Sequence, residues 1–554
     1  MNILVKTTIA LAAATVPFGA AAQDLSTEID VERTVTPEHR AAAPLSTVTP
    51  RAALTAGRPV LELAEFSLTD AGNPSPGAFG ADGADGLPEV SPYRGYAAIG
   101  YFPALNISGA AGYRFIDSDT TRLAAAVRYE GASWHALHRP DGSKGNAAHH
   151  TFGINAAASH LFGKVRLNVD GDYFHTAATT PLPVDKYSRS IDGAAITARI
   201  GADGRLSWYA RAHYIYTGVS KAPDGGDSPS ENRYGLTAAT DYKISRRFSA
   251  FIHADIDGFS RSGREWLADG TGTLQLTDIA RGSGAVISVV PGVGYSGTAF
   301  HARAAVRVNI GTGTGNSAVH VAPAVHLTWT PAPRFAIYAE ALGGEKVAGM
   351  RGMYDYSPLA MGLNSFGTTL TNIDARAGIR TGSLRGLSVG VEGRYAHTDG
   401  APMLATTSAG TAFAPFDICG WRAKAYVRYG APFADAFIKA TAEKLAHGAR
   451  HAFVADPDRP EWIVDVRIGA APLKALSLEA RWQWRADRCC YSLTGDSRTD
   501  LGDVNNLSLQ AVYNISSRLS CAITLENLLC RRYQIIAGVR SQGIHGLAGV
   551  QYKF

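Results

Sequence analysis

Four histidines lie close together in the sequence, and their side chains are the first candidates for chemistry. They are His135, His138, His149 and His150. Imidazole nitrogens are good ligands for transition metals, so a cluster of them could hold a metal ion. Their spacing is irregular, however, and no group of cysteines or carboxylates accompanies them. The pattern therefore favours a polar loop, and the sequence predicts no metal site.

Two short glycine motifs have the spacing of known catalytic or cofactor-binding loops. Gly292–Gly297 reads GVGYSG, as in dinucleotide-binding loops, but no helix follows to receive a phosphate at its N-terminus. Gly386–Gly390 reads GLSVG, as around a nucleophilic serine, but Ser388 opens a strand and does not join a strand to a helix. We therefore predict no cofactor and no catalytic residues, and we expect that the protein is not an enzyme.

Charged side chains instead recur at every second position. In residues 164–174, Asp170 and Asp172 alternate with Val169, Gly171 and Tyr173. A period of two places the charged set on one face of a strand and the apolar set on the other. A chain that crosses a membrane with such strands must turn the charged face toward a wet or plugged interior. We predict that the interior-facing set includes Asp170, Asp172, Asp255, Asp257, Arg481 and Arg485.

The whole segment 94–554 can be divided into strands of this kind. We count 22, with short connections after even-numbered strands and mostly long connections, such as 138–149, 346–372 and 397–417, after odd-numbered ones. Sorting of connections by length is typical of a transmembrane antiparallel β-barrel, whose turns are periplasmic and whose loops are extracellular. The mean hydropathy of −0.05 is too polar for a protein that crosses a membrane with several helices. The fold class predicted is an all-β transmembrane barrel.

The N-terminal residues indicate export. Residues 1–22 contain a single charged side chain, Lys6, followed by an apolar stretch and the small residues Ala20–Ala22. This composition is typical of a cleaved signal peptide and, with the barrel pattern, predicts the outer membrane of a Gram-negative bacterium. Residues 23–93 form an extension rich in Pro, Ala and Asp. The net charge of +5 shows no basic block, so we expect no nucleic-acid partner.

The last residues resemble the end of a TonB-dependent receptor. Val550, Tyr552 and the terminal Phe554 share one strand face, which is similar to the signal that the barrel-assembly machinery reads. Asn527, Leu528 and Tyr533 also match the family pattern before its last strand. The resemblance implies a barrel of 22 strands in outer-membrane lipids that takes up a solute. It departs from the family at the front, because only 71 residues separate residue 22 from the first strand and no plug motif is present.

A barrel of this size is too wide for wall side chains alone to fill. The sequence leaves three candidates for closing the interior: the extension 23–93, the connection 346–372, or a partner protein. It also leaves two functions open, a solute transporter and a non-transporting scaffold within an outer-membrane complex. The expected partners are a TonB-type energiser, a surface lipoprotein or a separate plug protein.

The five cysteines allow one structural expectation. The connections 488–502 and 529–542 emerge on the same side of the predicted barrel, and the protein is exported to an oxidising compartment. We therefore predict a disulfide that joins Cys530 to Cys489 or Cys490. Its loop of about 40 residues would stabilise the barrel by ~3–4 kcal/mol in the chain-entropy model.

Overall fold

The computed structural model describes most of the chain beyond residue 92. The predicted signal peptide and residues 23–92 of the extension lie outside the described residues. The described ranges are 93–102, 106–138, 142–182, 186–220, 228–268, 274–278, 282–313, 319–332, 334–360, 367–381, 387–407, 410–431, 436–447, 460–492 and 498–554.

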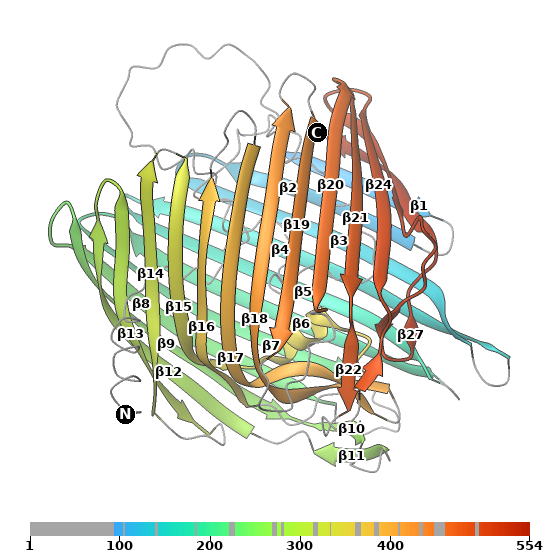
Figure 1. Ribbon diagram of the computed structural model, residues 1–554, viewed down its shortest axis with the longest axis horizontal. Helices are drawn as coiled ribbons and strands as arrows, with labels where there is room; N and C mark the ends of the chain where they lie inside the picture. Colours follow the sequence, from blue (N-terminus) through green and yellow to red (C-terminus); the bar gives the residue numbers. More distant parts are fainter. Residues whose placement is uncertain are drawn as a thin grey trace.

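The described chain forms a closed antiparallel β-barrel of 22 strands (Figure 1). The ring closes where the first strand pairs with the last, with Ile99 opposite Val550. In chain order the strands are β1 (Gly95–Phe102), β2 (Asn106–Asp117), β3 (Thr121–His138), β4 (Lys144–Phe162), β5 (Val165–Pro181), β6 (Lys186–Ala202), β7 (Leu206–Ser220), β8 (Ser230–Lys243), β9 (Phe248–Ser262), β12 (Gly282–Ser296), β13 (Phe300–Thr312), β14 (Val319–Ala332), β15 (Phe335–Val347), β16 (Thr368–Thr381), β17 (Leu387–Thr407), β18 (Gly410–Ala431), β19 (Ala436–His447), β20 (Trp462–Leu473), β21 (Leu476–Ala486), β24 (Val504–Asn514), β25 (Leu519–Glu526) and β28 (His545–Lys553). Each corresponds to one predicted strand, so the predicted fold class is confirmed.

The alternation of side chains explains why these segments form a barrel wall. On β9, Ile252 and Ile256 are exposed on the outer surface, whereas Asp255 and Asp257 between and beside them point inward. The same rule holds around the ring, so the outside is a band of apolar side chains and the inside is polar. Apolar side chains exposed on the outside of a closed sheet are stable when lipid surrounds them.

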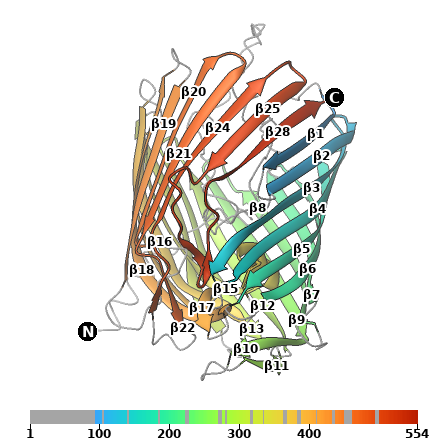
Figure 2. The same cartoon turned by 90° about the vertical axis from the view of Figure 1, so that its right-hand side faces the viewer.

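The two ends of the barrel differ. At the end that holds the C-terminus, strands are joined by tight turns, such as Ser118–Thr121 and the turn at Gly297, whose amide donates to the Phe300 carbonyl at 2.8 Å. The GVGYSG motif is therefore the end of β12 and its turn. At the opposite end, called here the outer end, the chain adds the helix α3 (Met350–Tyr356) and three small strand pairs. Figure 2 shows one of these pairs, residues 264–268 with 274–278, at the lower end of the view. These pairs are β10 (Arg264–Ala268) with β11 (Leu274–Asp278), β22 (Cys489–Ser492) with β23 (Arg498–Asp500), and β26 (Gln534–Ile536) with β27 (Val539–Arg540).

Two connections that the sequence predicts as long loops are mostly strand. Half of residues 138–149 belong to β4, whose strand begins at Lys144. Residues 397–417 belong largely to β17 and β18, which pair as far as Thr407 and Gly410. The register of β17 and β18 shifts between Thr398 and Ala401, and beyond this bulge the hairpin tip is buried on both faces. A strand without a polar face lacks the alternation from which strands are predicted. No helix among the described residues is long and apolar enough to cross a membrane.

Candidate functional site: the lumen and its outer cap

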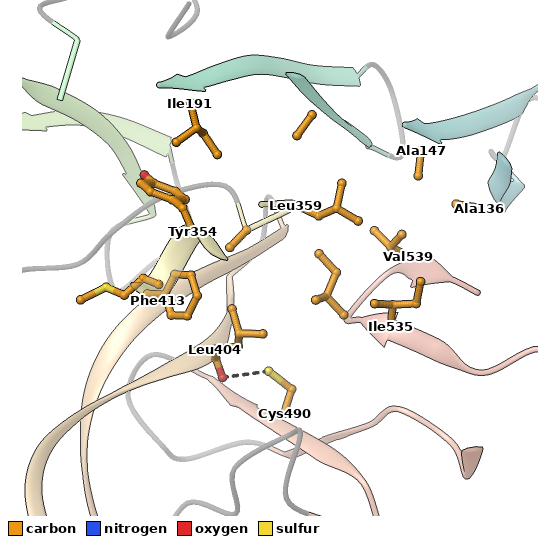
Figure 3. Packing of buried hydrophobic residues seen from close by; sticks show 14 of the residues in the cluster. Ala136, Ala147, Ile191, Tyr354, Leu359, Leu404, Phe413, Cys490, Ile535 and Val539 are labelled. Carbon is orange, nitrogen blue, oxygen red and sulfur yellow. Dashed lines mark hydrogen bonds between the residues drawn. The ribbon is translucent and has the colours of Figure 1, made fainter. Parts of the chain in front are cut away.

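The lumen is crossed near its outer end by a hydrophobic core. Three parts of the chain meet there: residues 348–360, which include α3; the hairpin tip 401–416; and the small pairs β22–β23 and β26–β27. We call these parts together the outer cap. Figure 3 shows Tyr354, Leu359, Phe413 and Ile535 of the cap packed into one cluster.

This cluster joins opposite walls of the barrel. Phe174 lies on β5, and Phe413 lies on the tip of β18; ten barrel strands stand between β5 and β18 in either direction around the ring. Both side chains belong to the same cluster, together with Leu359 and Ile191, which are not exposed at all. The cap is therefore packed against the wall as a domain core is packed.

A buried ion pair fixes the start of the α3 segment. Arg261 on β9 donates through Nε to Oε2 of Glu231 on β8 at 2.6 Å, and the two side chains are 3% and 1% exposed. The other oxygen of Glu231 accepts the backbone amide of Met350 at 2.9 Å, and Arg261 also donates to the carbonyl of Ala348. Both buried charges, Glu231 and Arg261, are thereby hydrogen-bonded to each other and to the cap backbone, as buried charges require.

Two other strands of the barrel, β5 and β6, hold the C-terminal end of the same segment. Thr180 on β5 donates to the carbonyl of Leu359, and Arg189 on β6 donates to the carbonyl of Pro358, both at 2.8 Å. The Arg189 guanidinium also lies 4.6 Å from the centre of the Tyr354 ring. Both hydrogen bonds are made to backbone carbonyls of the segment. They therefore depend on the course of its backbone more than on its side chains.

The helix itself carries an ionisable pair. Arg351 forms an ion pair with Asp172 on β5 and lies 3.6 Å from Asp355, four residues farther along α3. Burial raises the pKa of Asp355 to about 6, with the nearby Asp172 charge acting in the same direction and Arg351 acting against it. Asp355 therefore titrates near pH 6.

The second part of the cap is held by a buried arginine that donates to backbone carbonyls. Arg488 is fully buried and donates to the carbonyls of Gln534 at 2.8 Å and of Gly502 and Ile535 at 3.4 Å. From the far wall, Trp134 on β3 donates its indole N–H to the carbonyl of Arg540 at 2.8 Å. The β26–β27 pair thus bridges segments about 400 residues apart in the sequence.

The structure places the six predicted interior residues on the inward face of the wall. Asp172 reaches the cap, and Asp255 and Asp257 accept hydrogen bonds from Thr237 and Arg233. Arg481 pairs with Asp465 on the neighbouring strand. Arg485 is buried at the outer end of β21, and Asp170 lies one inward position below Asp172.

The predicted disulfide is not formed, and all five cysteines are free thiols. Cys490 lies in the cap core, where its thiol donates to the carbonyl of Leu404 at 3.2 Å. Cys489 is also buried, whereas Cys530 is exposed in the turn after β25. The expectation is wrong because β22 turns its cysteines into the core, which removes them from the surface that Cys530 occupies.

The four histidines do not converge. The Nε2 atoms of His135 and His138 lie 3.2 Å apart, but His149 contacts Thr151 and His150 contacts the Tyr129 hydroxyl. Within the part of the chain that the structure describes, no three His, Cys, Asp or Glu side chains are grouped as a metal site requires. These residues lie on β3 and β4, so the expected polar loop is in fact the extended outer end of two strands.

At the last strand, the predicted assembly residues lie on the outer surface. Val550, Tyr552 and Phe554 are between 42% and 48% exposed. The Phe554 ring stacks on Tyr113 with 6.1 Å between ring centroids, and its backbone exchanges two hydrogen bonds with Gly95 at 2.8 and 2.9 Å. Phe554 thus pairs with the start of β1. This contact lies at the end of the barrel that the sequence predicts to be periplasmic.

Comparison with known proteins identifies the fold. The sequence matches no family profile. It also matches no curated protein sequence. Among solved structures, it is similar to the ferric enterobactin receptor PfeA from Pseudomonas aeruginosa (10% identity, 83% of this chain and 81% of that chain, TM-score 0.62). It is similar to the copper transporter OprC (11%, 83% and 81%, 0.61) and to the FrpB iron transporter from Neisseria meningitidis (9%, 83% and 81%, 0.64). The chain has the barrel fold of TonB-dependent receptors.

Proposed function

We propose that the protein is an outer-membrane barrel that moves a solute across the outer membrane. The observation that carries the proposal is the combination of an apolar outer band, a polar lumen and a cap built from the chain's own loops. A barrel that served only as an anchor would need no solvent-accessible charges inside, yet Arg376 and Arg394 are 22% and 29% exposed there. Charges of this kind are tolerated where water or a solute reaches them.

The setting follows from the same reasoning. An exported chain with this surface belongs in the outer membrane of a Gram-negative bacterium, inserted by the barrel-assembly machinery. The similar structures bear names of metal and siderophore uptake, which supports transport as the class of activity. Energised transport requires a TonB-type partner, and we expect that partner, or a separate plug protein, to act at the periplasmic end.

Single-channel recording of the purified barrel in planar lipid bilayers tests the proposal. We expect the wild-type protein to conduct rarely, because the cap crosses the lumen. A variant in which residues 350–360 are replaced by a Gly-Ser linker of equal length should give large, steady currents. Heat-modifiable migration on gels shows that the variant is folded, and replacement of the exposed turn 203–205, which lies at the opposite end of the barrel from the cap, serves as the control.

One alternative is supported by a specific feature. The cap cluster buries its apolar side chains almost completely, which is what a non-transporting scaffold within an outer-membrane complex would have. A folded cap variant that remains electrically silent would overturn the transport proposal and favour the scaffold. Steady currents from that variant would show that its lumen is open, which would exclude a scaffold whose lumen is permanently filled.

A further inference from the structure

A hollow lies on the outer surface of the barrel where the ring closes. It crosses four strands that are consecutive around the ring, β24, β25, β28 and β1, which Figure 2 shows side by side. Its volume of about 590 Å³ falls within the range of roughly 300–1,000 Å³ that is usual for small-molecule sites. The apolar outer band is therefore indented here, and the indentation is large enough to receive a ligand.

The register of the strands produces the hollow. One row of directly paired outward residues crosses all four strands: Tyr101, Ala548, Ile523 and Ala511. Tyr101 and Ile523 are exposed on the outer surface, and the alanines that alternate with them leave gaps beside these large side chains. The hollow is thus the direct result of small residues paired with large ones.

The next row, nearer the tight turns, has the same character. Cys521 is paired with Val550 on one side and with Tyr513 on the other, so a small side chain again lies between two large ones. Val550 and Tyr513 are both exposed on the outer surface. The hollow therefore has a floor of small side chains and rims of large, mostly apolar ones.

This lining is suited to a hydrocarbon chain. Apolar side chains that face outward from a membrane barrel are surrounded by lipid tails, and the hollow is continuous with that surface. An acyl chain that enters it contacts the floor and both rims, whereas a chain on a smooth wall contacts the protein from one side only. Because burial of apolar area and dispersion both grow with the area in contact, the hollow binds such a chain more strongly than the rest of the wall does.

Two exposed cations lie beyond the end of the hollow that is nearer the tight turns. Arg518 lies in the turn between β24 and β25, three residues before Cys521, which is about 10 Å along a strand. Lys474 lies in the turn before β21, the strand that pairs with β24. The Arg518 guanidinium lies 5.8 Å from the centre of the Tyr93 ring, and neither cation has an ion-pair partner among the described residues.

The position of these cations matches that of lipid headgroups. Turns at the end of membrane-spanning strands lie at the level of the headgroups, where exposed Lys and Arg side chains attract anionic lipids. A guanidinium group donates paired hydrogen bonds to phosphate oxygens, and an ammonium group adds a compact positive charge. An acyl site and a phosphate site are therefore adjacent on this surface.

We propose that the hollow is a binding site for one phospholipid. Its acyl chain lies across the floor that Ala548, Cys521 and Ala511 form, and its phosphate is bound by Arg518 and Lys474. Because β1 and β28 pair at six positions only, the lipid also joins the first strand to its neighbours at the ring closure. The site depends on the membrane-facing surface alone and not on whether the barrel transports a solute.

Native mass spectrometry of the delipidated full-length barrel in dodecyl maltoside tests the site. The probes are dioleoylphosphatidylglycerol and dioleoylglycerol, which have the same acyl chains and differ in the phosphate headgroup. We expect the barrel to retain one molecule of the phospholipid. The fraction of barrels that carries dioleoylglycerol should be at least fivefold lower, because the diglyceride has no phosphate for the two cations.

Two double variants separate the acyl site from the phosphate site. Ala511→Leu with Ala548→Leu fills the floor with side chains that lipid tolerates, and it should lower the fraction carrying phospholipid at least tenfold. Lys474→Gln with Arg518→Gln should lower that fraction to the level of dioleoylglycerol and leave dioleoylglycerol unchanged.

The matched control also replaces two outward alanines by leucine, at directly opposite positions away from the hollow. Ala210→Leu with Ala238→Leu, on β7 and β8, should change the fraction carrying phospholipid less than twofold. Heat-modifiable migration confirms that each variant is folded. Absence of a complex with one phospholipid, equal losses in the two leucine variants, or equal retention of the two probes would overturn the site.

The same spectra report the mass of the protein assembly. A dimer that only the Ala511→Leu with Ala548→Leu variant loses would overturn the lipid site and assign the hollow to a second copy of the chain. None of these outcomes bears on transport, which the conductance experiment tests separately.

Discussion

At the scale of single residues, the cap depends on a few buried charges. The Glu231–Arg261 pair is the clearest, because almost no part of either side chain reaches solvent and both partners also contact the cap backbone. Removing one member of a buried pair leaves the other charged and unsatisfied, at a cost of about 3–5 kcal/mol. Such a loss would weaken the docking of residues 348–360 against the barrel wall.

We therefore predict that Glu231→Gln loosens the cap. Trypsin should cleave after Arg351 at least tenfold faster in this variant than in the wild type, while heat-modifiable migration stays normal. Asp203→Asn, a charge loss at an exposed turn, is the control and should have no effect. Equal cleavage rates in wild type and Glu231→Gln would show that the pair does not hold the segment.

Asp355 makes the docking of the cap dependent on pH. Its pKa of about 6 lies above the ordinary value of 3.8, so the docked state favours the protonated carboxyl. Docking is therefore strongest below pH 4 and weakens as pH rises through 6, where the buried carboxyl must ionise. Asp172, Arg351 and Arg128 are the charges that act on it.

The expected outcome is faster proteolysis of the cap at pH 7.5 than at pH 5, after correction for the protease's own pH dependence. Asp355→Asn should remove most of this difference and leave the cap docked at both values. A pH dependence that persists in Asp355→Asn would assign the effect to another group.

At the scale of elements, the wall and the cap differ in how far the sequence predicts them. Each barrel strand follows from alternation within about ten residues, as in 164–174, and all 22 were found. The cap cannot be predicted from local alternation, because its contacts join distant segments, such as Trp134 with Arg540. Its strands are also buried on both faces. The connection 346–372 was a candidate on its length and apolar residues, whereas nothing local marks the hairpin tip 401–416 as part of the closure.

The β26–β27 pair gives a prediction at this scale. Arg488→Met keeps the length of the side chain but removes the donors to three carbonyls, each of which costs about 1–3 kcal/mol when left unsatisfied. We expect protease cleavage at Arg540 to accelerate at least tenfold with the barrel intact. Arg498→Met on the exposed β23 is the matched control. Unchanged cleavage would mean that core packing alone holds the pair.

At the scale of the whole molecule, Phe554 contributes to the closure of the ring, beside the six paired positions of β1 and β28. Phe554 joins β28 to Gly95 through two backbone hydrogen bonds and stacks on Tyr113. Deleting Phe554 should leave the chain in the periplasm without heat-modifiable migration, whereas Phe554→Tyr, which keeps the ring, should assemble. Normal surface levels of the deletion would refute an assembly role for Val550, Tyr552 and Phe554.

The permeability of living cells shows which part of the chain closes the lumen. A barrel of 22 strands without a closing element would admit molecules that the outer membrane normally excludes. Replacing residues 350–360 removes the segment that Glu231, Arg261, Thr180 and Arg189 hold, so we expect cells carrying that variant to become sensitive to vancomycin. Deleting residues 24–85 behind an intact signal peptide tests the extension in the same assay. If only the first variant sensitises cells, the cap is the barrier; if only the second does, the extension occludes the barrel. If neither does at normal surface levels, a partner protein closes it.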